Sequence, residues 1–168
     1  KGRLVEKYDP PSSPFFGMKV IPEGVAFIIS DILQDNSARA PIFGTNSELR
    51  IDNQPVSVKT GTTNDLRDNW TIGFTPNLLT AVWVGNNDNT PMGGLTSGVT
   101  GAAPIWNDIM TMLLKNKPDE QITRPDQIVS LPCYGRTEYF VTGTAPLGGC
   151  PTIPPTPPTG GPTPTPTP

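Results

Sequence analysis

Lys59, Thr60, Gly61 and Thr62, followed by Thr63, are the residues of this chain best suited to chemistry. A lysine ammonium supplies a positive field, and threonine hydroxyls supply directed hydrogen bonds to a carboxylate. Gly61 lets a ligand approach the backbone closely, and a Thr62 N–H at a strand edge is placed to donate to a developing oxyanion. The pattern indicates recognition of a carboxylate and an acyl oxygen together.

The same residues also fit a purely structural role. A lysine on an edge strand opposes aggregation, and a glycine beside it can form a β-bulge. Ser57 precedes Lys59 by two residues, so the two share a strand face, but nothing else supports them as nucleophile and base. Both the ligand-binding and the structural interpretations stay open from these residues alone.

The overall composition excludes several classes of protein. The net charge is −3 and the basic residues are scattered, which argues against nucleic acid or an anionic membrane surface as a partner. The chain contains no histidine, which removes Ser-His-Asp and Cys-His catalysis and most zinc sites from consideration. No metal or cofactor is expected.

Cys133 and Cys150 flank a segment rich in glycine and proline, without the C-x-x-C spacing of a metal or redox motif. A disulfide is the favoured interpretation, and two unpaired buried thiols are the alternative. A disulfide would stabilise its segment by about 3 kcal/mol in the chain-entropy model and would indicate an oxidising, extracytoplasmic compartment.

The strand that carries Lys59–Thr62, here called the motif strand, is predicted to follow a helix. Pro22 and Glu23 suit a first helical turn, and apolar residues then recur at helical spacing to about residue 35. Residues 36–44 contain a proline and a glycine and predict a break. The expected buried face of the helix comprises Val25, Ile28, Ile29, Ile32 and Leu33.

Three antiparallel strands are predicted around residues 50–63, 69–75 and 79–86. Residues 70–74 alternate in polarity, a turn follows at residues 75–77, and the third strand is apolar on both faces, so it is expected to be buried on both sides.

After the strands, residues 86–89 are expected to form an ordinary turn, because they lack the spaced carboxylates of a calcium loop. A second helix is predicted over residues 103–115, with Pro104 in its first turn. Residues 118–150 show only short extended pieces, at 127–131 and 138–141. The three tryptophans, Trp70, Trp83 and Trp106, are expected in the core.

At the level of whole motifs the chain resembles the transpeptidase domain of class A penicillin-binding proteins, whose third active-site motif is Lys-Thr-Gly. The resemblance covers about residues 20–150 in order. It rests on residues 29–36, 38–40, 43–44, 59–65, 67–70, 73–76, 82–85, 101–106, 138–140, 143–144 and 146. The expected fold class is therefore α/β of the α+β type, an antiparallel sheet flanked by helices, as part of a penicillin-binding/β-lactamase-like transpeptidase domain.

The resemblance implies a serine acyl-transferase that takes a D-Ala-D-Ala stem peptide, forms an acyl-enzyme and passes the acyl group to a neighbouring stem. Penicillin and other β-lactams mimic that donor. Lys59 would orient the proton-transfer network and attract the carboxylate, and Thr60, Gly61, Thr62 and Thr63 would line the substrate site. The Thr62 amide would be one of two oxyanion donors.

Two further motifs of the family are absent from the sequence. Neither Ser-x-x-Lys nor Ser-x-Asn occurs in the 168 residues, so the nucleophile is expected in an N-terminal part that precedes this chain. That part would also carry any membrane anchor of an extracytoplasmic enzyme, and the fragment alone is expected to be inactive.

The predicted organisation is the C-terminal part of a transpeptidase domain over residues 1–117, an exit segment with the possible disulfide over 118–150, and a disordered proline- and threonine-rich tail over 151–168. Two alternatives remain: a related carboxypeptidase or β-lactamase, and a non-catalytic wall-binding or spacer module.

Overall fold

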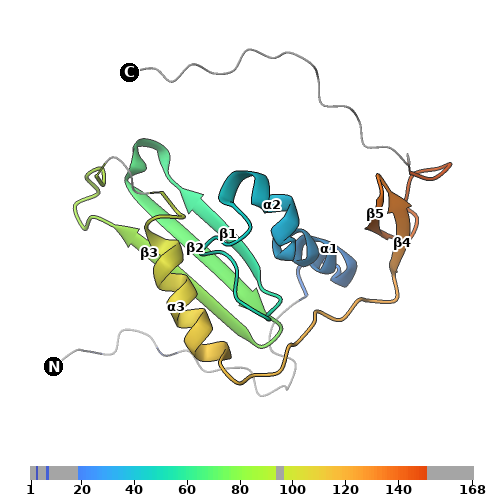
Figure 1. The fold of residues 1–168 in the computed structure, drawn as a ribbon, viewed down its shortest axis with the longest axis horizontal. Helices are drawn as coiled ribbons and strands as arrows, with labels where there is room; N and C mark the ends of the chain where they lie inside the picture. The colour runs from blue at the N-terminus through green and yellow to red at the C-terminus, as the bar shows by residue number, and fades with distance from the viewer. Residues whose placement is uncertain (1–2, 4–6, 8–18, 94–96, 151–168) are drawn as a thin grey trace, which may run out of the picture.

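The computed structural model describes residues 3, 7, 19–93 and 97–150, so the predicted disordered tail at 151–168 lies outside the described residues (Figure 1). The described part is a mixture of helices and antiparallel strands, as predicted. Its elements, in order, are α1 (Glu23–Gln34), α2 (Asn36–Phe43), β1 (Ser57–Thr62), a 3-10 turn (Asn64–Leu66), β2 (Asp68–Thr75), β3 (Leu78–Gly85), α3 (Ala102–Leu114), β4 (Ile128–Cys133) and β5 (Arg136–Val141).

Strands β1, β2 and β3 form one antiparallel sheet in that order, so β1 and β3 are its edge strands. The β2–β3 hairpin turns at Pro76 and Asn77, which confirms the predicted hairpin. In the register, Gly61 of β1 lies opposite Trp70, and Trp70 lies opposite Trp83 of β3. Cross-strand partners project from the same face of a sheet, so the register assigns every side chain to a face.

One face of the sheet is covered by α3, which crosses β2 and β3 (Figure 1). Trp106 of α3 is fully buried and lies on Gly73 of β2, where a Cβ atom would collide with the indole ring. Glycine at residue 73 is therefore what lets the helix approach the sheet. The buried core on this side consists of Leu49, Ile51, Val56, Val58, Ala103, Trp106, Met110 and Leu114.

The opposite face of the sheet is largely open. Its apolar side chains have high exposed fractions: 42% for Trp70, 40% for Ile72, 65% for Leu79 and 43% for Trp83. The expectation that the third strand is buried on both sides is therefore wrong, as is the expectation that Trp70 and Trp83 belong to the core. The reason is that α3 covers only one face, while α1 meets the other face near its end, at Ser57.

Helix α1 occupies the predicted residues but buries a different side. Gly24, Phe27 and Ser30 are buried, whereas three apolar residues of the expected face, Val25, Ile29 and Ile32, are 41–60% exposed. Gly24 and Ser30 are small and allow the helix to approach β1 and β5 closely. This close contact, rather than the spacing of the apolar residues, determines which side of the helix is buried.

The first helix ends at Gln34, which agrees with the predicted break, but residues 36–43 then form a separate short helix, α2, which was not predicted. The Asp35 carboxylate accepts a hydrogen bond from the Ala38 N–H at 2.9 Å, a helix N-cap that offsets the unfavourable Pro41 inside the helix. The helix ends at Phe43, and its C-cap residue Gly44 has a φ of 82°, which suits glycine.

The first strand begins later than predicted. Residues 51–54 form a tight turn closed by a bridge between Ile51 and Gln54, and regular pairing starts only at Ser57. Pro55 explains the delay, because it has no N–H to donate to a strand ladder. By contrast, α3 matches its predicted bounds within a residue.

Strands β4 and β5 form a separate hairpin that docks on α1, and they correspond to the two short extended pieces predicted for this region (Figure 1). The Phe27 and Tyr139 rings meet edge to face with their centroids 5.4 Å apart.

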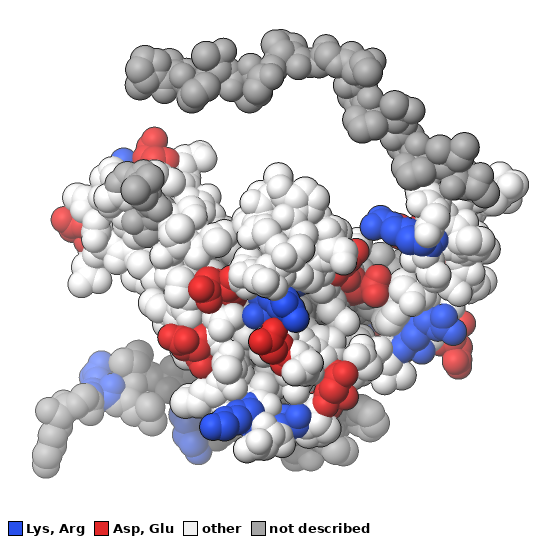
Figure 2. Space-filling model, in the orientation of Figure 1, with Lys and Arg blue, Asp and Glu red and all other residues white. Residues whose placement is uncertain are grey.

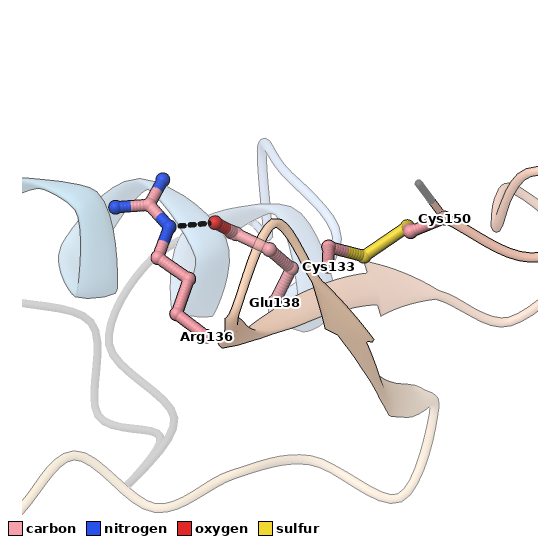
Figure 3. The surroundings of a disulfide bond; sticks show 4 residues. All are labelled: Cys133, Arg136, Glu138 and Cys150. Atoms are coloured by element: carbon pink, nitrogen blue, oxygen red, sulfur yellow. Dashed lines mark ion pairs between the residues drawn. A yellow bond between two sulfur atoms is a disulfide. The ribbon is translucent and has the colours of Figure 1, made fainter. Parts of the chain in front are cut away.

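Cys133 and Cys150 are joined by a disulfide with an S–S distance of 2.03 Å, and Arg136 pairs with Glu138 beside it (Figure 3). Within the described residues, no helix is both long and apolar enough to cross a membrane.

Candidate active-site strand

Lys59 lies on the edge strand β1 and is exposed to solvent. Its register partner is Ile72, so its side chain starts on the open face of the sheet together with Gly61. The ammonium Nζ folds over the strand edge and donates to the carbonyl oxygen of Thr60 at 2.7 Å. A positive charge is thereby held at the outer edge of the sheet.

Thr60 and Thr62 project from the face that α3 covers, since side chains alternate along a strand. Their backbone groups, however, point outward. The N–H of Thr63 bonds inward to the carbonyl oxygen of Asp68 at 3.1 Å, so alternation directs the N–H of Thr62 to the free edge. The ammonium of Lys59 and an outward amide thus lie along one unpaired strand edge, and the side chains of Thr60 and Thr62 leave this edge on the face that α3 covers.

The Thr62 hydroxyl has a partner on the sequence-distant turn before α3. Its oxygen accepts a hydrogen bond from the N–H of Gly98 at 3.0 Å. The carbonyl oxygen of Gly98 in turn accepts from the buried hydroxyl of Thr71 at 3.1 Å. The motif strand, β2 and the start of α3 are therefore linked through one glycine.

Thr63 has a different environment from the other threonines. Its hydroxyl accepts from the N–H of Asp68 at 3.0 Å and donates to the carbonyl oxygen of the same residue at 3.2 Å. It closes the turn between β1 and β2. The predicted substrate contact of Thr63 stays a prediction, and it competes with this local role.

The turn between β1 and β2, which follows the Lys59–Thr62 motif, contacts the loop after β3. Asp65 and Arg67 form an exposed ion pair at 3.8 Å, and Arg67 also donates to the carbonyl oxygen of Asn89 at 2.6 Å. Exposed pairs of this kind stabilise little. Arg67 mainly links the turn after β1 to the loop after β3.

Residues 86–90 form a hydrogen-bonded turn, as predicted. Asn86 donates to Thr90, and the Asp88 carboxylate accepts from the backbone and the hydroxyl of Thr90. These hydrogen bonds lower the pKa of Asp88 below its ordinary value, those from the Thr90 hydroxyl and backbone contributing most. Over the described residues, no group of three or more His, Cys, Asp or Glu side chains is arranged to hold a metal ion.

Charge is mixed over the surface that Figure 2 shows, with acidic and basic side chains interspersed. A cavity of about 960 Å³ lies between residues 46–54 and the C-terminal half of α3. None of the motif residues lines it, and its walls carry both signs of charge, including Glu48, Arg50 and Lys117. The motif residues therefore lie at an open strand edge, apart from this cavity.

Sequence reasoning located the motif strand but missed the residues that support it. Asn69 and Thr71 of β2 are fully buried, and Asn69 accepts a hydrogen bond from the N–H of Ala102 at the start of α3. Gly101 lies against Asn69, and the carbonyl oxygen of Gly98 accepts a hydrogen bond from Thr71. The only available signal was two polar residues on the strand face that packs on a helix, together with the small residues before Pro104.

No protein-family model matches the chain, but individual proteins do. It is 33% identical over 141 residues to penicillin-binding protein 1A of Neisseria lactamica, covering 84% of this chain and 17% of that protein. It is 37% identical over 123 residues to penicillin-binding protein 1A of Pseudomonas aeruginosa, covering 71% of this chain and 14% of that protein. For penicillin-binding protein 1A of Aquifex aeolicus the identity is 30% over 163 residues, covering 82% and 22%.

A solved structure agrees with these relatives. The crystal structure of penicillin-binding protein 1A from Haemophilus influenzae matches with a TM-score of 0.53 and 35% sequence identity, covering 55% of this chain and 16% of that chain. The helix-backed antiparallel sheet is accordingly that of a partial penicillin-binding transpeptidase domain. The chain belongs to the class A penicillin-binding proteins, and the relatives that it resembles are penicillin-binding proteins 1A. It spans between 14% and 22% of the length of these three relatives.

Proposed function

We propose that this chain forms one wall of the active site of a serine D,D-transpeptidase, an enzyme that binds penicillin and cross-links peptidoglycan stem peptides. The observation that carries the proposal is the strand edge at Lys59–Thr62, in a chain related to penicillin-binding proteins 1A. A cation, two hydroxyls and an outward N–H suit the two anionic centres of an acyl transfer, the terminal carboxylate and the tetrahedral oxyanion.

In this mechanism a serine supplied by another part of the protein attacks the carbonyl carbon of the penultimate D-Ala. The carbonyl oxygen becomes an oxyanion, and the Thr62 N–H stabilises it as one of two donors. Collapse of the intermediate breaks the C–N bond, and the terminal D-Ala leaves with the proton that the serine hydroxyl has lost. The amine of a neighbouring stem then attacks the acyl-enzyme and forms the new amide bond, and its proton returns to the serine. Lys59 and the hydroxyls of Thr60 and Thr62 hold the terminal carboxylate, and Gly61 leaves room for the backbone of the donor peptide.

The open surfaces support the proposal that a further part of the same domain completes this site. The exposed sheet face carries Trp70, Ile72, Leu79 and Trp83, and α1 exposes its own apolar stripe at the end of that face. Large exposed apolar patches on soluble domains mark surfaces that another domain, segment or partner molecule covers. We assign that body to the segment with the Ser-x-x-Lys and Ser-x-Asn residues, which also supplies the membrane anchor of an extracytoplasmic enzyme.

The disulfide supports the proposed location outside the cytoplasm, since such bonds persist in oxidising compartments. The partners assigned to the site are D-Ala-D-Ala stem peptides and β-lactams, with no cofactor.

The test is acylation of the full-length protein by a fluorescent penicillin. Lys59→Ala should slow labelling by roughly 100-fold or more, as expected for removal of an electrostatic stabiliser of an anionic transition state. Lys115→Ala is the matched control, because Lys115 is an exposed lysine just after α3 and does not contribute to the motif edge. Absence of labelling in the full-length protein, or equal labelling of both variants, would contradict the proposal. A non-catalytic spacer would give the first of these results.

A further inference from the structure

The turn from Ser97 to Gly101, which precedes α3, is fastened to the motif strand. Gly98 donates its N–H to the Thr62 hydroxyl at 3.0 Å and accepts from the Thr71 hydroxyl at 3.1 Å. Its carbonyl oxygen also accepts from the N–H of Ala103 at 3.0 Å. Gly98 therefore sits at the junction of β1, β2 and α3, and all three contacts use its backbone.

The contact with Gly98 determines what the Thr62 hydroxyl can do. An amide N–H has a proton and no lone pair, so the hydroxyl oxygen must be the acceptor of this hydrogen bond. Within the described residues, the hydroxyl proton of Thr62 has no acceptor. Because Thr62 is exposed, that proton is left to be donated to a ligand at the strand edge.

The turn also approaches the sheet closely at Gly98, so that a side chain there would have to displace its neighbours by a few tenths of an ångström. A Cβ atom at residue 98 would lie 3.0 Å from the Thr60 Cβ, 3.2 Å from the Gly61 carbonyl oxygen and 3.3 Å from the Trp70 carbonyl oxygen. Two of these three neighbours are backbone atoms of the sheet and yield little. Gly98 thus packs against Thr60 and bonds to Thr62 on the face of the sheet that α3 covers.

A role only in starting α3 would not require the contact with Thr62. The first turn of α3 is already held by Asn69, whose side-chain oxygen accepts from the N–H of Ala102 at 2.9 Å. Asn69 is fully buried and lies against Gly101. The Gly98 bond to Thr62 is additional, and it reaches a motif threonine whose backbone N–H also faces the free edge.

We propose that Gly98, held by the buried hydroxyl of Thr71, is a positioning residue that fixes the Thr62 hydroxyl as a hydrogen-bond donor to the substrate carboxylate. This inference rests on the proposed function and deepens it. Thr71 touches no substrate; it holds the carbonyl group of Gly98, and the N–H on the other side of the Gly98 Cα positions the Thr62 hydroxyl.

The experiment measures how strongly the full-length enzyme prefers a carboxylate. Acylation rate constants are determined for benzylpenicillin and for its methyl ester, and their ratio gives the preference. Thr71→Val keeps the shape of the side chain but removes the hydroxyl, and it should lower the preference about tenfold, the size of effect expected for a weakened charge-assisted hydrogen bond. Thr71→Ser keeps the hydroxyl and should keep the wild-type preference.

Two further variants separate positioning from general loss of stability. Thr75→Val removes a buried hydroxyl from the same face of β2, far along the strand from the motif, and should leave the preference unchanged. In a Thr62→Val background, adding Thr71→Val should produce no further change, because the hydroxyl that it positions is gone. Gly98→Ala should reproduce the loss, which provides a second route if Thr71→Val folds poorly.

An unchanged preference in Thr71→Val and Gly98→Ala, with acylation by the ester retained, overturns the positioning role while leaving the proposed function intact. So does an equal loss of preference with and without the Thr62 hydroxyl. If the wild-type protein is not acylated by either compound, the proposed function fails first, and this inference fails with it.

Discussion

The hydroxyl of Ser57 in β1 donates to the carbonyl oxygen of Ser30 in α1 at 2.7 Å, and Ser57 is fully buried. This bond ties α1 to the motif strand two residues before Lys59. Both residues are small, which lets the helix lie directly on the strand. The position of the motif edge thus depends on a helix that lies 27 residues earlier in the sequence.

Replacement of Ser57 by alanine should lower the free energy of unfolding by about 1 kcal/mol, because one buried hydrogen bond is lost without creating a large cavity. Urea denaturation of the protein measures the change. Ser37→Ala in α2 is the control, since Ser37 is exposed and should be neutral. Equal stability of both variants would show that the bond contributes nothing.

Replacement of Gly73 by alanine should destabilise the fold by about 1–3 kcal/mol, the range for overpacking a closely fitted core. The added Cβ collides with the buried indole of Trp106, so α3 must move away from the sheet. Thermal unfolding, with the near-ultraviolet signal of tryptophan, follows the change. Gly93→Ala should be neutral by comparison, because its Cβ would meet no heavy atom within 4 Å.

Removal of the disulfide should loosen the β4–β5 hairpin more than the three-stranded sheet. Cys133 and Cys150 are 17 residues apart in sequence, and closing a loop of this size contributes about 3 kcal/mol in the chain-entropy model. Hydrogen exchange in a double variant with alanine at both cysteines should accelerate in β4 and β5 and remain slow in β2. Uniform acceleration in both sheets would contradict this separation.

Asp31 should make stability depend on pH. Burial raises the pKa of its carboxyl, and the negative charges of Asp35 and Glu138 add to the rise; Arg124 lines the same cavity. A raised pKa means that the folded state binds the proton more tightly than the unfolded state. The contribution of Asp31 is therefore most favourable below its ordinary pKa of 3.8 and is lost as the pH rises through the folded-state pKa.

Asp31→Asn removes this penalty and should stabilise the protein at pH 7, with the gain shrinking as the pH approaches 3.8. Urea denaturation at several pH values gives the curve. Asp108→Asn, at an exposed position of α3, is the control and should show no comparable gain. A gain of equal size at pH 7 and below pH 3.8 would mean that the effect is not electrostatic.

The hairpin and α3 could be predicted because local features specify them. Alternation in residues 70–74, a turn at Pro76, and Pro104 in a first helical turn are properties of neighbouring residues. Alternation does not, however, say which face of a strand is covered. Trp70, Trp83 and Trp106 look alike in sequence, yet only Trp106 is buried, because the cover of each face comes from segments far along the chain.

The residues that support the candidate site could not be predicted from the sequence, for the same reason. Lys59–Thr62 forms a recognisable motif, whereas Gly98 acts through its backbone and by the absence of a side chain. Thr71 is an ordinary strand residue until its partner, 27 residues later, is known. Contacts of this kind follow from the register of β1 and β2 and the place where α3 begins.

The link between Cys133 and Cys150 also defines a mechanical path. Tension applied to the chain beyond Cys150 passes through the sulfur bridge directly to the end of β4, so residues 134–149 bear none of it. Strand β5, including Tyr139 and its contact with Phe27, lies within that shielded loop. A pull from the C-terminal side would thus load β4 as a whole before it could peel β5 away from α1.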